Sequence, residues 1–272
     1  MRNDQADLGQ LDKKTSLFEI LTSRLYELVC EKGDVCVDAG GSYGDHSSGM
    51  LRMVGPTGTV HVIEAIPYLA DRLKSIALKN ELPLIVHNFA LSDRLGRSRF
   101  QHVKNFTGAS GLWHREHLDP SVDIETIDVE LTRVDILLSG RLPSWRFFKL
   151  DIECGEFHAI RGAIDSIKQH SPFITFENGF GQTAAIAGYT KSEWFDLFDG
   201  IGYRPYDLYG YEIDHSRWPD HAQPYNSIAV PKGSEDEAFV TDIWRNEVDR
   251  VVADVRDGKK SWPPAAFETV RI

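Results

Sequence analysis

The most informative segment for chemistry is a glycine-rich turn that follows a short apolar run. Residues 34–38 end in an acid, Asp38. Glycines between a strand and a helix let the backbone approach a ligand closely, and the start of the helix offers free N–H donors. The turn therefore predicts a site for the polar end of a cofactor, lined by four of its residues: Gly40, Ser42, Tyr43 and Gly44.

A second acid ends the next apolar run. Glu64 follows the β-branched residues 59–63 and precedes Ala65. A carboxylate at that point can hold both ribose hydroxyls of a nucleotide cofactor. Either acid alone is explained as a strand-terminal cap, but Asp38 and Glu64 flank a glycine turn in β-α-β order. Together they favour a nucleotide-type cofactor.

Two cofactors fit this arrangement. A dinucleotide site has the pattern G-x-G-x-x-G, and the chain offers Ala39, Gly41 and Gly44 at those spacings. A site for S-adenosylmethionine (SAM) has an acid just before the glycines, where Asp38 can accept a hydrogen bond from the ammonium group of SAM. Glu64 does not discriminate between the two, because both cofactors contain a ribose.

The third strand, expected at 84–89, is followed by Ala90, Leu91, Ser92 and Asp93. The carboxyl ends of parallel strands meet at one edge of a sheet, so we expect Ala90 and Leu91 beside the adenine and Asp93 at its rim. A simple turn before a glycine explains Asp93 equally well.

The fourth apolar run, residues 147–151, ends in ionisable side chains. Lys149, Asp151 and Glu153 alternate, which places them on one face while the chain stays extended. A lysine between two acids is expected to form an ion-pair network. The network is either catalytic, with Asp151 nearest the reacting centre, or purely structural.

The fifth run, residues 173–177, ends in an acid and an amide, Glu177 and Asn178. Together with Asp151 they offer three oxygen ligands from adjacent strand ends, a set that suits Mg²⁺. Glu177 is also a candidate base. His114 is the best histidine candidate for that role, although a single histidine is more often a surface residue.

Strands and helices alternate along the chain. A helix is expected at about 16–30, beginning with a capping box of Ser16 and Glu19, and a second capping box pairs Thr190 with Glu193. The β-α-β-α-β order implies parallel strands. Two further runs close the sheet, and two insertions are expected to cover the substrate pocket. The two runs are 203–208 and 225–230, and the insertions are about 94–140 and the lid-like loop 209–224.

The composition limits the classes of binding partner and the cellular compartment that we expect for this protein. Thirty Lys and Arg against 41 Asp and Glu give a net charge of −11, which disfavours nucleic acid and anionic membranes. Cys30, Cys36 and Cys154 are too few for a disulfide framework and suggest a reduced, cytoplasmic protein. We expect no signal peptide and no membrane span.

The ordered set of motifs resembles the FkbM-type SAM-dependent methyltransferases. The turn at 37–44 resembles the family's D-x-G-A-N-x-G, residues 62–67 its F-E-P segment, and 90–93 match its A-L-S-D. Residues 133–135 resemble T-L-D, and 148–156 resemble K-I-D-V-E-G-x-E with Cys154 as an extra residue. The sequence differs from the family motifs at Gly41 and Ser42, in the cofactor turn, and at Cys154, after the central strand.

The resemblance implies an α/β fold of the Rossmann-like class I methyltransferase type, with a seven-stranded, mostly parallel sheet and helices on both faces. It implies SAM as methyl donor and a hydroxyl acceptor on a small molecule, sugar, polyketide or peptide. We expect this domain over 1–232 and a C-terminal helix and tail over 233–272. A homodimer is possible.

The leading function is O-methylation, with four catalytic candidates: Asp151, Lys149, Glu177 and His114. Two alternatives stay open: an NAD-dependent oxidoreductase on the same kind of fold, and a scaffold that binds SAM without catalysis.

Overall fold

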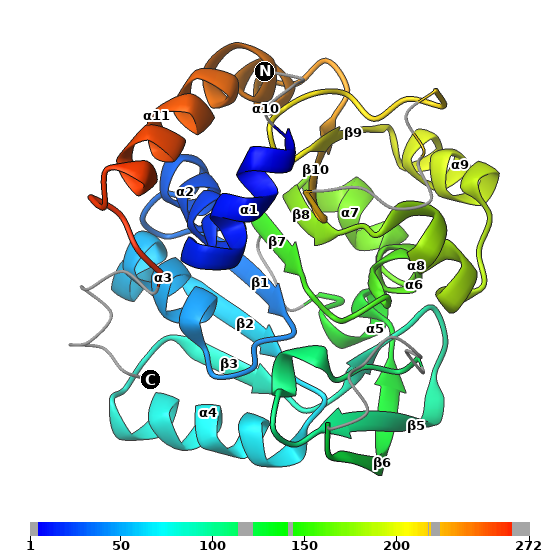
Figure 1. Ribbon diagram of the computed structural model, residues 1–272. Helices are drawn as coiled ribbons and strands as arrows, with labels where there is room; N and C mark the ends of the chain where they lie inside the picture. The colour runs from blue at the N-terminus through cyan, green and yellow to red at the C-terminus, as the bar shows by residue number, and fades with distance from the viewer. Residues whose placement is uncertain (1–4, 114–121, 141–143, 217, 219–223, 263–272) are drawn as a thin grey trace.

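A seven-stranded sheet with the order β3-β2-β1-β7-β8-β10-β9 is the centre of the computed structural model (Figure 1), which describes residues 5–113, 122–140, 144–216, 218 and 224–262. Its strands are β1 (Val35–Ala39), β2 (Thr59–Ile63), β3 (Leu84–His87), β7 (Phe147–Leu150), β8 (Phe173–Glu177), β9 (Tyr203–Asp207) and β10 (Asn226–Pro231).

Most of these strands are parallel. β10 is antiparallel to both of its neighbours, β8 and β9, whereas the pairs from β3 to β8 are all parallel. The carboxyl ends of β1, β2, β3, β7 and β8 therefore meet at one edge of the sheet. The expected seven-stranded, mostly parallel α/β sheet is confirmed.

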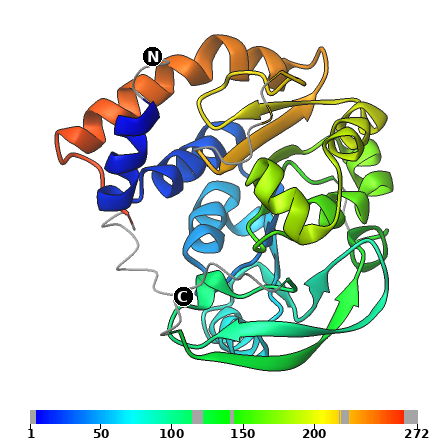
Figure 2. The same cartoon turned by 45° about the vertical axis from the view of Figure 1, so that its right-hand side comes forward.

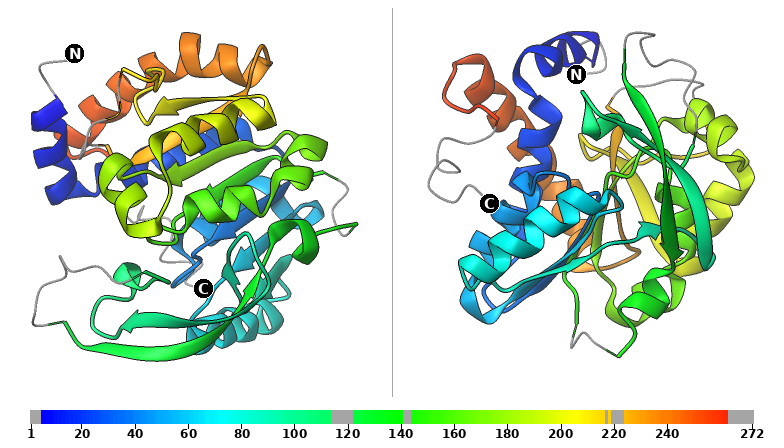
Figure 3. Two further views of the ribbon diagram at one scale, coloured as in Figure 1. Left: turned by 90° about the vertical axis from the view of Figure 1, so that its right-hand side faces the viewer. Right: turned by 90° about the horizontal axis from the view of Figure 1, so that it is seen from below.

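Helices cover both faces of the sheet (Figures 1 and 3). One face carries α2 (Leu17–Val29), α3 (Asp45–Val54), α4 (Pro67–Lys79) and α11 (Arg245–Arg256). The other carries α6 (Glu156–Arg161), α7 (Ile164–His170), α8 (Phe180–Ala187) and α9 (Lys191–Ile201). Within β1, Cys36 packs in the first core and Val37 in the second. Each central strand is thus buried on both sides, which explains its continuous apolar sequence.

The stretch at 94–140 adds a second, three-stranded sheet with the order β4-β6-β5. It contains β5 (Gly96–Val103), β6 (Ile124–Thr132) and the short helix α5 (Val134–Leu137), and it pairs with β4 (Ala90–Leu91). Its apolar residues, among them Phe100 and Leu131, pack on Ile66 and Leu69 at the start of α4. Figure 2 shows the β5–β6 hairpin at the edge of the molecule below the main sheet. Short 3₁₀ turns occupy Gly55–Thr57 and Thr107–Ala109.

The N-terminal segment differs from the expected capping box. A first helix, α1 (Gln5–Thr15), precedes α2, and Ser16 between them is left-handed with φ 54° and makes no side-chain cap. Asp12 Oδ1 instead accepts from the Phe18 N–H at 2.8 Å, and Glu19 turns to His46. The capping box at Thr190 and Glu193 is confirmed.

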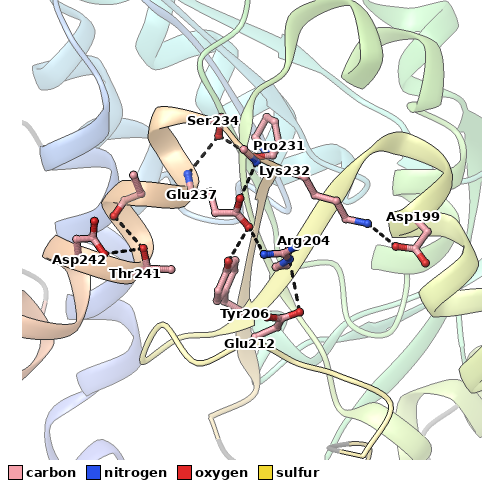
Figure 4. Close-up of polar contacts among 12 residues, drawn as sticks. Asp199, Arg204, Tyr206, Glu212, Pro231, Lys232, Ser234, Glu237, Thr241 and Asp242 are labelled. Atoms are coloured by element: carbon pink, nitrogen blue, oxygen red, sulfur yellow. Dashed lines mark hydrogen bonds and ion pairs between the residues drawn. The ribbon is translucent and has the colours of Figure 1, made fainter.

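The C-terminal helices are fastened to the sheet by polar contacts. α10 (Glu235–Ala238) leads through a π-helical stretch, Phe239–Trp244, into α11. Arg146 of the segment before β7 donates two hydrogen bonds to Asp236, at 2.7 and 2.6 Å. Figure 4 shows Glu237 accepting from the Tyr206 hydroxyl at 2.9 Å and pairing with Arg204 at 2.8 Å. These contacts tie α10 to β9.

Within the described chain, none of the helices combines the length and the apolar character that a membrane crossing requires.

Candidate active site

A cavity lies at the carboxyl ends of β1, β2 and β7. Its apolar wall includes Ile63, Ile66, Leu69, Phe89, Leu91 and Leu112. Its polar side chains are Ser42, Glu64, Thr107, Ser110, Asp151 and Glu153. An apolar cavity with a few convergent polar groups is the usual form of a small-molecule site.

The glycine turn forms one side of this cavity because its backbone passes very close to neighbouring strands. Gly40 has φ +82°, and a Cβ added to it would lie 1.9 Å from the carbonyl oxygen of Asp151. A Cβ at Gly41 would lie 2.1 Å from Cγ1 of Val62. Both positions therefore require glycine, because any side chain would collide with the residues against which the turn packs.

Glu64 is the buried acid of the cavity, with a side chain only 5% exposed. Its Oε2 accepts from the Ser42 N–H and its Oε1 from the Ile66 N–H, both at 2.7 Å. Burial raises the pKa of Glu64, and the backbone hydrogen bonds from Ile66 and Ser42 oppose that rise. The carboxylate is therefore held in one orientation by the turn that it faces.

The structure brings most of the predicted cofactor residues together. Those that line the cavity are Gly40, Ser42, Glu64, Ala65, Ala90, Leu91 and Asp151. Gly44 precedes α3 with φ +91°, and Asp38 lies beneath the turn at 1% exposure. The Tyr43 ring is exposed and packs under Arg72, whose guanidinium carbon is 5.4 Å from its centre.

A buried lysine joins the two central strands. The register pairs Asp38 of β1 with Lys149 of β7, and Lys149 Nζ lies 3.6 Å from Asp38 Oδ1 and 3.3 Å from Asp151 Oδ2. Burial alone would lower the pKa of Lys149, but the charges of Asp151, Asp38 and Glu19 outweigh it and raise the pKa. The second Asp38 oxygen accepts from the Ser47 hydroxyl at 2.5 Å. The predicted Lys–acid network is present.

The extended alternation expected up to Glu153 is wrong, because the strand ends three residues earlier. β7 ends at Leu150, and Glu153 and Cys154 have φ of +57° and +74°. The chain has therefore left the extended conformation, although Glu153 still lines the cavity.

The Mg²⁺ set predicted from Asp151, Glu177 and Asn178 is not supported. Lys149 already forms an ion pair with Asp151, and Asn178 Oδ1 accepts from the Phe180 N–H at 3.0 Å. No group of three or more His, Cys, Asp or Glu side chains in the described part of the chain is placed to hold a metal ion. Burial, followed by the charge of Asp151, raises the pKa of Glu177 well above its usual value.

Sequence reasoning missed one pair at this end of the sheet. His46 Nε2, in the first turn of α3, lies 2.6 Å from Glu19 Oε2 of α2. The Trp262 ring packs on His46 with the ring centres 4.7 Å apart. Only the placement of His46 just after the turn hinted at a role, and nothing in the sequence connects it with Glu19. His114 lies outside the described residues.

Asp93 lies in a neighbouring cavity, with His158 and Arg161. Its Oδ2 contacts His158 Nδ1 at 3.2 Å and accepts from Arg161. Burial would raise the pKa of Asp93, but these two partners outweigh it and lower the pKa. Leu112 lines both cavities, so the two share a wall.

We compared the chain with protein-family models, with curated proteins and with solved structures. A family model described as the methyltransferase FkbM domain matches residues 38–205. No curated protein matches the chain.

Solved structures with a similar arrangement include a methyltransferase FkbM from Methylobacillus flagellatus KT, with 16% identity over 76% of this chain and 50% of its own, and a TM-score of 0.43. A second is a SAM-dependent O-methyltransferase from Thermotoga maritima (13% identity, 77% and 63% covered, TM-score 0.40). A third is an O-methyltransferase from Streptomyces achromogenes in complex with SAM, with 12% identity over 78% of this chain and 77% of its own, and a TM-score of 0.39. The chain spans half the length of the Methylobacillus protein.

Proposed function

The chain belongs to the FkbM methyltransferase family, and from this premise we propose that it transfers a methyl group from SAM to a hydroxyl oxygen of an acceptor. The observation that carries the proposal is the placement of Glu64. Its buried carboxylate faces the cavity from the end of β2, directly opposite the glycine turn that it holds through Ser42.

Glu64 is proposed to accept hydrogen bonds from both ribose hydroxyls of SAM. A carboxylate has about four acceptor positions, and the backbone N–H groups of Ser42, Ile66 and Ala65 do not use all of them here. Gly40 and Ser42 would hold the methionine end above Asp38, since both residues line the cavity.

The adenine is proposed to lie against the apolar wall formed by Ala65, Ala90 and Leu91. Flat apolar surface suits a purine ring. Asp93 lines the neighbouring cavity and contacts His158 and Arg161 there, so we do not include it in the proposed cofactor site.

When bound, SAM supplies an electrophilic methyl group on a cationic sulfonium. Asp151 lines the same cavity, and we propose that it orients the acceptor hydroxyl. Lys149 fixes the Asp151 carboxylate by an ion pair that is buried on the lysine side. Orientation of the two reactants is the main contribution that a protein makes to such a displacement.

Methylation of a hydroxyl also releases a proton. Glu177 ends β8 beside Asp151, and its raised pKa makes its carboxylate a stronger base than an ordinary one. We therefore propose Glu177 as the proton acceptor. His114 remains an alternative base on the sequence alone.

The acceptor is proposed to be a neutral hydroxyl compound, such as a sugar, polyketide or peptide. The reacting end of the cavity is acidic, with Asp151 and Glu153 on its wall, and it would repel an anionic acceptor. The three cysteines are buried and free of disulfide bonds, which suits the reducing cytoplasm.

The first test is a melting experiment with S-adenosylhomocysteine (SAH) and with NAD. A ligand at 100 times its Kd stabilises the native state by about 2.7 kcal/mol, so SAH should raise the Tm and NAD should not. Stabilisation by NAD alone would instead identify an oxidoreductase.

The second test is turnover with deuteromethyl-labelled SAM and pools of hydroxylated sugars, polyketides and peptides, with detection of the labelled product by mass. Glu177→Gln is the matched variant: it should keep the SAH affinity and lose turnover. SAH binding without turnover in any pool would favour a non-catalytic scaffold.

A further inference from the structure

The cavity that holds Asp93 is locally cationic, in contrast to the chain as a whole, which carries a net charge of −11. Its charged lining residues are Asp93, Arg94, His158 and Arg161, and Ser92, Ser98 and Trp113 add polar and aromatic surface. The cavity is separated from the cofactor cavity by the shared wall at Leu112. Its chemistry is therefore distinct from that of the acidic reacting end.

His158 is held by both of its ring nitrogens. Nε2 lies 2.9 Å from the carbonyl oxygen of Ala187, and Nδ1 lies 3.2 Å from Asp93 Oδ2. Both partners are acceptors, so both contacts are hydrogen bonds only when the ring carries two protons. The Trp113 ring is stacked on His158, with the ring centres 5.3 Å apart and the planes inclined by 17°. This geometry holds the His158 ring between Asp93 and the backbone of α8, with one ring face covered by Trp113.

Arg161 shares the same Asp93 oxygen and keeps most of its donors. A guanidinium has five N–H donors, and one of its nitrogens contacts Asp93 Oδ2 while its carbon packs 5.3 Å from the Phe157 ring centre. The side chain is 43% exposed. Its remaining N–H groups are therefore available to a ligand.

Arg94 is the cation that Asp93 does not neutralise. It is exposed, it lines the cavity, and it forms no hydrogen bond or ion pair with another residue in the described ranges. The lining of this cavity thus includes two arginines and one carboxylate, Asp93. Two arginines at one cavity match the planar, two-pronged recognition of a carboxylate or phosphate group.

We propose that this cavity binds a small organic anion through Arg94 and Arg161, at a site separate from the cofactor and the methyl acceptor. The ligand carries a carboxylate or a phosphate group, and Trp113 offers ring surface to the rest of it. Asp93 sets the affinity by competing with the anion for Arg161.

The experiment titrates the full chain with sodium phosphate and with sodium benzoate at constant ionic strength, using calorimetry and Tm, with sodium chloride as reference. Saturable binding of one of the two anions is expected, and the stronger one identifies phosphate or carboxylate as the preferred group. Arg94→Met and Arg161→Met should each weaken it by about tenfold, the effect of one charge-assisted hydrogen bond.

Two further variants make the test specific. Arg97→Met is the matched control, because Arg97 is an exposed arginine of β5 that pairs with Glu130 and does not line the cavity, and it should leave the anion affinity unchanged. Asp93→Asn should tighten anion binding, because it removes the competing charge.

Arg94→Met also keeps the test valid if Arg161→Met fails to fold. Unchanged affinity in Arg94→Met, or no saturable binding beyond that of chloride, would overturn the proposal. Displacement of the anion by saturating SAH would do so as well, since it would place the anion in the cofactor cavity.

Discussion

Glu19 of α2 and His46 of α3 are joined at the reacting end of the sheet by a contact of 2.6 Å between Oε2 and Nε2. Glu19 lies outside the family match, which begins at residue 38. A helix that precedes the matched region therefore contributes a charged side chain close to the ends of the strands. Burial would raise the pKa of Glu19, but the hydrogen bond and charge of His46, with the charge of Lys149, lower it to about 2.

This pair predicts an acid-sensitive contribution to stability. The folded-state pKa of Glu19 lies below its usual 4.5, so the unfolded state binds a proton first as the pH falls. The contribution is complete above pH 4.5 and is lost as the pH falls towards 2. Glu19→Gln should therefore be less stable than the parent above pH 4.5, and the difference should shrink in acid. Urea unfolding across that range measures it, and a constant difference would contradict the assignment.

Removal of the buried lysine should be costly. Lys149→Met leaves Asp38, 1% exposed, without its cation, and an uncompensated buried charge costs about 3–5 kcal/mol. The matched control is Lys74→Met, since Lys74 forms an exposed pair with Asp71 that is worth less than about 1 kcal/mol. Equal midpoints in urea for the two variants would show that the network is not a stabilising one.

Glu177 should have the opposite pH dependence to Glu19. Its raised pKa means that the folded state keeps a proton that the unfolded state releases near pH 4.5. The resulting stabilisation is present below pH 4.5 and is lost as the pH rises through the raised folded pKa. The Tm of the parent should therefore fall relative to that of Glu177→Gln as the pH rises. Parallel Tm curves would mean that Glu177 titrates normally.

The glycine turn allows a matched pair of alanine substitutions. Gly40 and Gly188 both have positive φ, +82° and +77°, but only at Gly40 does an added Cβ meet another atom within 4 Å, the carbonyl oxygen of Asp151. Gly188→Ala should cost about 1–2 kcal/mol for the left-handed backbone alone. Gly40→Ala should cost more and should also weaken SAH, because the turn must move away from β7. Equal unfolding energies would contradict the close approach.

Glu64 should determine the affinity for the cofactor. Loss of a charge-assisted contact to the ribose costs roughly 1.5–3 kcal/mol, so Glu64→Ala should bind SAH about tenfold more weakly or worse. Glu130→Ala is the control, since Glu130 is an exposed acid of the hairpin. Calorimetric affinities that match between a folded Glu64→Ala variant and the parent would exclude this assignment.

Much of the site follows from short-range patterns in the sequence. A glycine turn after an apolar run that ends in Asp38, and an acid ending the next run, predict where the backbone must come close to a ligand. These features are local because a strand–turn–helix unit is encoded by its own residues, and parallel β-α-β order then brings their ends to one edge. Glu64 and Asp151 both reach the same cavity for that reason.

Tertiary structure alone decided which side chains meet across that edge. The register that sets Lys149 opposite Asp38 depends on β7 pairing with β1, and the contact of Glu19 with His46 depends on how α2 packs against α3. The cations that hold Asp93 come from α6, more than 60 positions along the chain. Residues so distant are neighbours only after the sheet has ordered its strands and the helices have packed on it, because their spacing in the sequence carries no periodicity that could predict the contact.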